Sequence, residues 1–396
     1  MVIKPKIRGF ICTNAHPVGC AEHVKEQIAY VKAQGPINNG PKNVLVIGAS
    51  TGYGLASRIT AAFGAGAKTL GIFFEKEGTE KKPASAGWYN TAAFQQAADE
   101  AGLWSKNING DAFSDELKAK AIETIKAEMG KVDLIIYSLA SPRRTDPKSG
   151  ETFSSVLKPI GQTITTKNLN TSKRIIDEVT VEAANEEEIA NTVKVMGGED
   201  WELWLEALKE ADVLAEGFKT TAYTYIGKEL TWPIYGHATI GKAKEDLDRA
   251  TDAIKASTAH LNGEAYVASL NAVVTQASSA IPIMPLYIST LFKVTKEEGT
   301  YEGTIEQIQG LFSENLYGET PRFDDGGHLF QNYKELEDGV QARIKAIWDK
   351  VDTDSIDELT DYAGYHNEFL KLFGFGIESV DYDADVDTAV EINHLI

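Results

Sequence analysis

The architecture of this chain is best read from one segment, Val44-Leu45-Val46-Ile47-Gly48-Ala49-Ser50-Thr51-Gly52-Tyr53-Gly54-Leu55-Ala56, where a run of apolar residues breaks into three closely spaced glycines. A strand can turn this tightly into a helix only where side chains are absent. The start of that helix offers unpaired N–H groups and the positive end of the helix dipole, which together favour a pyrophosphate. The segment therefore predicts a strand–turn–helix unit that binds a dinucleotide, with a purely structural turn as the alternative.

The glycine spacing and the next strand narrow the choice of dinucleotide. The spacing Gly-x3-Gly-x-Gly is the variant typical of short-chain dehydrogenases and reductases, not the Gly-x-Gly-x-x-Gly fingerprint. The following strand-like run, 69–74, ends at Glu75, about 20 residues past the turn. A carboxylate there binds the adenosine ribose hydroxyls and repels a 2′-phosphate. The sequence favours NADH over NADPH, unless Glu75 is only a solvated acid beside Lys76.

Composition excludes several classes of protein. The net charge of −19, from 39 basic and 58 acidic residues, argues against a nucleic-acid partner, which needs a basic face. The first residues lack the apolar segment of a signal peptide. The longest apolar run, Ala280–Phe292, is shorter than the ~20 residues that cross a bilayer. We expect a cytoplasmic protein with no membrane span, and 43% hydrophobic residues suffice for a large core.

Strand and helix patterns alternate along the first part of the chain. Strands are predicted at 44–47, 69–74, 103–108, 133–139, 220–226 and 266–275, and helices at 54–63, 91–101, 114–130, from 185, 239–261, 285–296, 304–315, 333–351 and 354–373. Such alternation predicts an α/β fold with a Rossmann-like, doubly wound parallel sheet. We expect one enlarged domain over 1–396: an N-terminal extension (1–40), a cofactor-binding core (41–280) with an insertion (143–200), and a helical substrate-site region (281–396).

The chemistry of such sheets lies at the carboxyl ends of their strands. Two of these ends carry small or polar residues, Asn109-Gly110-Asp111-Ala112 and Tyr137-Ser138-Leu139-Ala140-Ser141-Pro142. Small side chains let a flat ring or a ribose approach the backbone. Asp111 is a candidate for the adenine amino group, or else a simple turn former.

A tyrosine and a lysine supply the proton in reductases of this fold. The phenol donates a hydrogen bond, then a proton, to the oxygen that becomes negative as hydride arrives, and a nearby ammonium stabilises the charged phenol. The usual spacing is Tyr-x3-Lys, but after Tyr235 that position is Thr239. Lys242 and Lys244 remain as candidates.

Helical periodicity separates these two lysines. For a helix starting near Thr239, the apolar or small residues are Ile240, Ala243, Leu247, Ala250, Ile254 and Thr258. On a helical wheel Lys244 lies about 65° from the centre of this face and Lys242 about 135° away. Lys244 is therefore predicted to reach a cofactor packed against the sheet, with two ordinary surface lysines as the alternative.

Two other patterns have both a functional and a structural interpretation. The series Cys12, His16, Cys20 and His23 has residue types that bind zinc, but its intervals are unlike zinc-finger loops, and we expect Pro17 to break any helix aligning them. We expect no metal site. The apolar run 280–288 suits a lid over an apolar ligand, or equally a buried core helix.

Taken together, these residues resemble the FabV-type, NADH-dependent trans-2-enoyl-thioester reductases, a family of enoyl-acyl-carrier-protein and trans-2-enoyl-CoA reductases. The resemblance covers essentially the whole chain, including Ala15-His16-Pro17, Val195-Met196-Gly197-Gly198-Glu199-Asp200-Trp201 and Phe373-Gly374-Phe375. Its distinctive mark is a Tyr-x8-Lys pair, which Tyr235 and Lys244 match.

The resemblance implies specific roles. Tyr235 is expected to donate the proton, Lys244 to hold the nicotinamide ribose, and Tyr225 to contact the thioester carbonyl. The NADH contacts it implies are Gly48, Ala49, Ser50, Thr51, Gly52, Tyr53, Phe74, Glu75, Asp111, Ala112, Leu139, Ala140, Lys244, Val273, Val274 and Thr275. A monomeric short-chain-reductase core with extra elements over the substrate site is expected.

The expected reaction is reduction of the C2=C3 double bond of a trans-2-enoyl thioester, the final step of bacterial fatty acid elongation. The substrate is carried by acyl-carrier protein or coenzyme A. Both carriers are anionic, so a local basic patch must offset the overall charge, for which Arg143, Arg144, Lys148 and Lys158 are candidates. The alternatives are a short-chain carbonyl reductase and a non-catalytic NADH-binding regulator.

Overall fold

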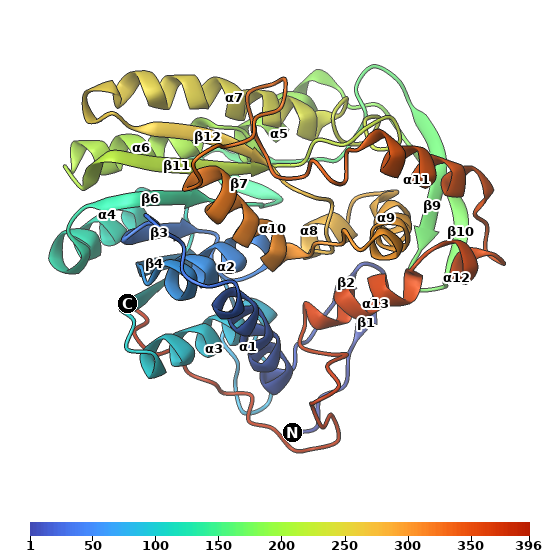
Figure 1. The fold of residues 1–396 in the computed structure, drawn as a ribbon, viewed down its shortest axis with the longest axis horizontal. Helices are drawn as coiled ribbons and strands as arrows, with labels where there is room; N and C mark the ends of the chain where they lie inside the picture. Colours follow the sequence, from blue (N-terminus) through green and yellow to red (C-terminus); the bar gives the residue numbers. More distant parts are fainter.

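The computed structural model describes residues 1–396, and a seven-stranded parallel sheet runs through its centre (Figure 1). Its strands are β3 (Asn43–Ile47), β4 (Lys68–Phe73), β5 (Ser105–Asn109), β6 (Val132–Tyr137), β11 (Leu214–Thr224), β12 (Glu264–Ser269) and β13 (Leu329–Phe330). Their order across the sheet is β13-β12-β11-β6-β3-β4-β5, and every neighbouring pair is parallel. The expected Rossmann-like α/β fold is confirmed at this level.

The order of the strands locates the ligand-binding edge. The chain builds outward from β3 to β4 and β5, returns to β6 on the other side of β3, and continues outward to β13. The order therefore reverses between β3 and β6, and ligands bind at the carboxyl ends of strands beside such a switch point.

Helices cover both faces of the sheet. Leu45 and Ile47 of β3 pack with α4 (Asp115–Thr124), α6 (Glu199–Glu210) and α7 (Thr239–Ser257) in one core cluster. Val44 and Val46 point the other way, into a cluster with α1 (Pro17–Ala33), α2 (Gly52–Ile59), α3 (Ala86–Glu100) and α10 (Thr304–Gly310). Alternation along a strand that is apolar throughout thus produces the two covered faces of a doubly wound sheet.

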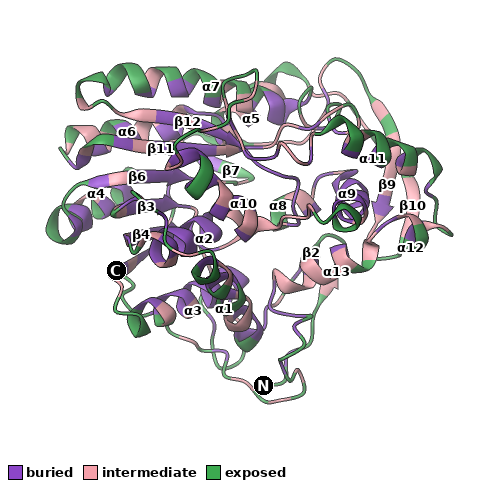
Figure 2. Ribbon diagram, in the orientation of Figure 1, coloured by how far each residue is buried: buried purple, intermediate pink, exposed green.

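A third core lies beyond the carboxyl ends of the strands. It centres on α9 (Met284–Glu298), against which α11 (Asp338–Lys350), α13 (Tyr362–Lys371) and the hairpin of β9 (Ile164–Asn170) and β10 (Ile175–Val181) are assembled. Figure 2 shows α9 as a buried helix within this group. The apolar run 280–288 therefore includes the first turn of a core helix. Of the two expectations for this run, a lid over a ligand or a buried core helix, the structure shows the core helix.

Smaller elements complete the chain. They are β1 (Ile7–Arg8), β2 (Ile11–Cys12), β7 (Arg143–Thr145), β8 (Thr152–Ser154), α5 (Glu186–Met196), α8 (Gln276–Ser279), α12 (Ile356–Leu359), and the one-turn extensions η1 (Thr60–Gly64), η2 (Ile125–Met129), η3 (Ala259–Leu261) and η4 (Leu311–Leu316). The insertion 143–200 thus contains two hairpins as well as the predicted helix after Asn185. The predicted helix 354–373 is divided into α12 and α13.

The expectation that Pro17 breaks a helix is wrong. Pro17 is the first residue of α1. At this position the missing N–H of proline costs no hydrogen bond, because the first N–H groups of a helix have no partner within it. His16 caps this helix, since its Nδ1 accepts from Gly19 N at 3.1 Å. A 17-residue helix thus lies inside the segment expected to be a short extension.

The end of the chain lies along the outer edge of the sheet. The backbone carbonyl of Asn107 in β5 accepts from Ile396 N at 2.9 Å, and the backbone N–H of Asn107 donates to His394 O at 3.0 Å. Further back, the hydroxyl of Tyr89 donates to Thr388 O and the indole of Trp88 to Val390 O. In the segment 388–396, the last three residues therefore pair with the edge strand β5, and the residues before them are held by α3. None of the helices combines the length and apolar character needed to span a membrane.

Candidate active site

The glycine turn between β3 and α2 has geometry that only glycine satisfies. Gly48 has a φ of +89°, and a Cβ there would lie 2.2 Å from Ser138 O at the end of β6. A Cβ at Gly54 would lie 1.8 Å from Gly48 O. Thr51 precedes α2 without a side-chain cap, so the backbone N–H groups at this helix start are left for a ligand. These features fit the pyrophosphate of a dinucleotide.

Other predicted cofactor residues surround this turn. Thr275 Cγ2 would be 3.6 Å from a Cβ at Gly52, and the Tyr53 hydroxyl donates to Asn271 O at 2.8 Å. Both contacts join the turn to the loop after β12, in which Val273 and Val274 are buried. The turn, the end of β6 and the loop after β12 therefore meet at one edge.

Glu75 is held at the end of β4. Its Oε1 accepts from Ser50 Oγ at 2.7 Å, and its backbone N–H donates to Asn109 Oδ1 at 2.9 Å. Gly87 lies so close that a Cβ there would be 2.0 Å from Glu75 Oε1. This carboxylate is thus fixed beside the glycine turn, while the neighbouring Phe74 is 78% exposed.

The two remaining predicted loops also follow strand ends. Ala112 is buried and Asp111 is exposed after β5, where the Asp111 carboxylate accepts from Phe113 N at 3.0 Å. Leu139 is half-buried and Ala140 exposed after β6. Asp111 therefore forms a turn and has an exposed side chain at the carboxyl end of β5.

Lys244 lies on α7, as the helical wheel predicted. All six residues of the predicted apolar face are buried, whereas Lys242 is exposed and pairs with Glu245. The Lys244 ammonium donates to Tyr223 O of β11 at 2.9 Å. The choice of Lys244 over Lys242 as the inward-facing lysine is confirmed.

Tyr235 and Lys244 line one cavity of about 120 Å³ at the end of β11. Tyr225, Trp232, Asp248 and His328 belong to the same wall. The rings of Tyr225 and Tyr235 meet edge to face, with centroids 5.1 Å apart and an interplanar angle of 84°. The predicted proton donor, its lysine and the predicted substrate contact are therefore brought together.

Burial shifts the pKa values of this pair in opposite directions. It raises the pKa of the Tyr235 phenol above its usual range, and the Tyr225 backbone and the Thr224 hydroxyl act against that shift. Burial lowers the pKa of Lys244 to about 8, with Asp248 acting in the opposite direction. The phenol is therefore held neutral, ready to donate, and Lys244 titrates close to neutral pH.

Tyr225 has a partner that the sequence patterns missed. Its hydroxyl donates to Glu335 Oε1 at 3.1 Å, and the Tyr287 hydroxyl donates to the same oxygen at 2.8 Å. Glu335 is fully buried, and Ala272 N donates to its Oε2 at 2.7 Å. Glu335 lies in the polar run Gln331–Glu335, where no periodicity marks it as buried.

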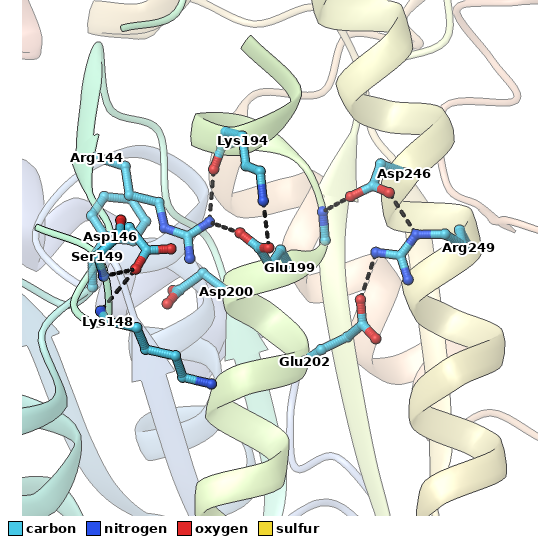
Figure 3. A network of polar contacts seen from close by, with 12 residues as sticks. Arg144, Asp146, Lys148, Ser149, Lys194, Glu199, Asp200, Glu202, Asp246 and Arg249 are labelled. Atoms are coloured by element: carbon cyan, nitrogen blue, oxygen red, sulfur yellow. Dashed lines mark hydrogen bonds and ion pairs between the residues drawn. The ribbon is translucent and has the colours of Figure 1, made fainter. Parts of the chain in front are cut away.

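A polar network positions α7 from the side of the insertion (Figure 3). Asp246 Oδ2 accepts from Gly198 N at 2.8 Å, and Asp246 and Glu202 both pair with Arg249. The start of α6 is thus tied to the helix that carries Lys244. The same network contains Arg144, which is buried and pairs with Glu199.

These ion pairs reduce the set of candidate carrier contacts. Arg144 is 2% exposed and Lys158 pairs with Glu188 at 2.6 Å, so neither offers a free surface charge. Arg143 and Lys148 are exposed. Only these two of the four predicted basic residues are therefore placed to meet an anionic carrier.

Two residues of the Cys/His series, His16 and Cys20, belong to the packed structure around α1. His16 caps α1 and packs edge-on against Tyr382, with ring centroids 4.9 Å apart. Cys20 is fully buried, and burial raises the pKa of its thiol. No group of three or more His, Cys, Asp or Glu side chains is arranged to hold a metal ion.

Comparisons with known families cover almost the whole chain. Residues 82–317 match the trans-2-enoyl-CoA reductase catalytic region, and residues 2–80 match the NAD(P)H binding domain of trans-2-enoyl-CoA reductase. Residues 323–386 match the enoyl reductase FAD binding domain.

Individual relatives agree with these matches. The chain is 83% identical over 396 residues to an enoyl-[acyl-carrier-protein] reductase [NADH] of Pseudoalteromonas translucida, with both chains fully covered. The solved trans-2-enoyl-CoA reductase of Treponema denticola, in complex with NAD, is 47% identical with a TM-score of 0.95, covering 99% of this chain and 100% of its own. The corresponding Clostridium enzyme, in complex with NADH, is 41% identical with a TM-score of 0.95 and the same coverage. The resemblance inferred from the motifs is confirmed.

Residues 323–386, which match an FAD binding domain, contain the starts of three helices, α11, α12 and α13. A flavin dinucleotide carries a pyrophosphate, which favours helix starts without negative charge. Within 323–386, α11 begins with Asp338, and the first turn of α12 contains Asp357 and Glu358. Asp361 caps α13, and its carboxylate accepts from Gly364 N. These residues do not fit a flavin pyrophosphate, in contrast to the uncapped glycine turn at α2.

Proposed function

This chain belongs to the trans-2-enoyl-CoA reductase family, and from that premise we propose that Tyr235 and Lys244 carry its reaction at the carboxyl ends of β6 and β11. The chain is an NADH-dependent oxidoreductase that reduces the carbon–carbon double bond of enoyl thioesters. The observation that carries the proposed assignment is the cavity shared by Tyr235, Lys244 and Tyr225, at the same sheet edge as the glycine turn.

Bound NADH supplies a hydride to C3 of the trans-2-enoyl thioester. The electrons of the double bond then move toward the thioester oxygen, where the Tyr235 hydroxyl donates a hydrogen bond as negative charge develops. Tyr235 supplies the proton that leaves C2 saturated, and Lys244 stabilises the phenolate that results. Hydride, proton and substrate thus combine into one saturated acyl thioester.

The remaining side chains bind and orient. Lys244 also holds the nicotinamide ribose, and Tyr225 contacts the thioester carbonyl. Glu75 binds the adenosine ribose, which the fixed position of its carboxylate beside Ser50 supports. The other proposed NADH contacts are Gly48, Ala49, Ser50, Thr51, Gly52, Tyr53, Phe74, Asp111, Ala112, Leu139, Ala140, Val273, Val274 and Thr275.

We extend the proposal to organisation. The fold is of the short-chain dehydrogenase/reductase type. Its support is the Gly-x3-Gly-x-Gly turn after β3 and, after β11, Tyr235 followed by the helix α7 that carries Lys244. Residues 1–396 form one domain, because the central sheet draws strands from segments matched by three different family models. The enzyme is a cytoplasmic monomer, and light scattering of the purified chain measures its mass directly.

The carrier of the acyl group is acyl-carrier protein, coenzyme A or both. Arg143 and Lys148 are exposed cations after β6, so they are the proposed contacts for either anion. Steady-state rates with enoyl-CoA and enoyl-carrier substrates of matched chain lengths decide the preference. Replacing both cations by glutamine should raise KM more than it lowers kcat, because they bind the carrier and not the reacting atoms.

One substrate comparison tests the reaction itself. Crotonyl-CoA and acetoacetyl-CoA are both thioesters of coenzyme A. They differ in the group to be reduced, which is a carbon–carbon double bond in the first and a ketone in the second. NADH oxidation is expected with crotonyl-CoA and not with acetoacetyl-CoA. The reverse outcome would identify a carbonyl reductase, and NADH binding without turnover of either would identify a regulator.

A further inference from the structure

Glu335 is a buried carboxyl group directly behind the active-site tyrosines. It is fully buried and lies between the end of β12, the start of α11 and the buried helix α9. Its Oε1 accepts from the hydroxyls of Tyr225 and Tyr287, and its Oε2 from Ala272 N. The Gln341 amide donates to the Tyr287 hydroxyl at 3.0 Å and to the Glu335 backbone carbonyl at 2.7 Å. Three donors therefore converge on one carboxylate.

The charge of this carboxyl group decides where the Tyr225 proton points. An ionised carboxylate only accepts hydrogen bonds, so it holds the Tyr225 hydroxyl proton on itself. A neutral carboxyl carries a proton. The backbone N–H of Ala272 cannot turn away from Oε2, whereas the Tyr225 and Tyr287 hydroxyls at Oε1 can rotate, so Oε1 is the oxygen that can bear the proton. The carboxyl can then donate to the phenol oxygen of Tyr225, whose own proton becomes free for another acceptor.

We infer that Glu335 is a positioning residue that, in its protonated form, turns the Tyr225 hydroxyl from the carboxylate toward the oxygen of the substrate thioester. The inference rests on the proposed contact of Tyr225 with that oxygen. In the ionised form the same hydroxyl donates to Glu335, and the substrate oxygen loses one of its two phenolic donors. No covalent bond is made or broken at Glu335, and the group returns to its starting state after each turnover.

The surroundings of Glu335 favour such a switch near neutral pH. Burial raises the pKa of Glu335 to about 7, although the donors Ala272 N, Tyr287 and Tyr225 act in the opposite direction. The titratable side chains that face it are Tyr225, Tyr287 and, from α2, Tyr53, whose pKa values burial and the Glu335 charge raise well above their usual range.

Charged neighbours are engaged elsewhere or line the cavity. Lys334 pairs with Glu302, and Asp338 pairs with Lys228 at 2.6 Å. Lys244 and His328 share the cavity wall with Tyr225; the pKa of Lys244 is about 8 and that of His328 about 9. Any pH effect of Glu335 must therefore be separated from the titration of Lys244, which the comparison of variants achieves.

The first test is the pH profile of kcat/KM for crotonyl-CoA, measured for Glu335→Gln and the wild type at saturating NADH. A glutamine keeps the acceptor for Ala272 N and always donates from its amide, so it imitates the neutral acid. The wild-type kcat/KM should fall above about pH 7 by up to tenfold per pH unit, until the residual rate without that donor is reached. The ratio of variant to wild-type kcat/KM should therefore rise about 10- to 100-fold between pH 6 and pH 9.

A double variant separates positioning from a general structural effect. In the background of Tyr225→Phe no hydroxyl remains to be turned, so adding Glu335→Gln should leave the ratio of rates constant across pH. Glu264→Gln is the control for removing a partly buried carboxylate, because Glu264 lies at the opposite end of β12 and pairs with Lys219. Its pH profile should match that of the wild type.

Tyr287→Phe is a second variant for the same test, to be used if Glu335→Gln does not fold. It removes one donor to the carboxylate, so it should raise the pKa of Glu335 and move the fall in kcat/KM to higher pH. A ratio that stays flat with pH in Glu335→Gln, or a fall that does not move in Tyr287→Phe, overturns the inference. Both results require a wild-type enzyme that reduces crotonyl-CoA, so they leave the proposed function intact; absence of that activity would instead refute the function.

Discussion

Gly54→Ala tests whether the glycine turn is shaped for NADH. The new methyl group would lie 1.8 Å from Gly48 O and 2.9 Å from Gly48 C, with Ser138 Oγ at 3.3 Å. The oxygen contact is about 1.6 Å shorter than the 3.4 Å at which ordinary contact begins. Both Gly48 atoms are backbone, so no side chain can rotate away, and α2 must separate from the end of β3.

The expected cost follows from this overlap. Overpacking in a tight region costs about 1–3 kcal/mol. This cost is divided between a lower free energy of unfolding and weaker NADH binding. If all of it falls on binding, the Kd for NADH rises about 5- to 150-fold. Since kcat/KM with NADH depends on the same loop, it should fall by a similar factor.

The assay is a titration of NADH fluorescence together with urea unfolding of the same samples. Gly339→Ala is the matched control, because a Cβ at Gly339 meets nothing within 4 Å and the residue lies in α11, away from the turn. The control should bind NADH like the wild type and unfold at no lower urea concentration. A folded Gly54→Ala protein with wild-type stability and wild-type NADH affinity would refute the assignment of this turn to the cofactor.

Three other changes have defined outcomes. Tyr235→Phe should lower kcat about 10²–10³-fold while NADH still binds, and near-wild-type turnover in a stopped-flow assay would remove Tyr235 as the acid. Glu75→Ala should shift the ratio of kcat/KM values toward NADPH; an unchanged ratio would leave Glu75 without a role in coenzyme choice. Burial opposes a charge on His328, but Asp248 and Asp324 raise its pKa to about 9, against about 6.5 in the unfolded chain. The resulting stability, about 3 kcal/mol, is fully present below pH 6.5 and lost as pH rises through 9, so the difference in unfolding free energy between wild type and His328→Gln should disappear over that interval.

The core of the fold was predictable because its elements are long and strongly patterned. Six of the seven strands of the sheet were predicted. The apolar runs of β3, β4 and β6 are typical of parallel strands that are buried on both faces. The six-residue face of α7 and the inward position of Lys244 followed from helical periodicity alone. The two-residue strand β13 is too short to leave such a pattern.

The parts that were missed depend on contacts between distant segments. Pro17 reads as a helix breaker locally, but the backbone of His16 is held by Phe373, which places Pro17 at the start of α1. Gly374 fits there only because it lacks a side chain: a Cβ would lie 2.5 Å from Cys20 N. Glu335 is a lone acid in the sequence and becomes an active-site neighbour only when α9 and β12 enclose it.

The course of segment 388–396 has a consequence for biosynthesis. On the ribosome, β5 is complete roughly 285 residues before His394 and Ile396 reach its outer edge. During that interval the edge strand has free N–H and C=O groups that can pair with a strand of another nascent chain. Chains truncated before residue 388 should therefore aggregate during translation more than full-length chains, even where their NADH site can form.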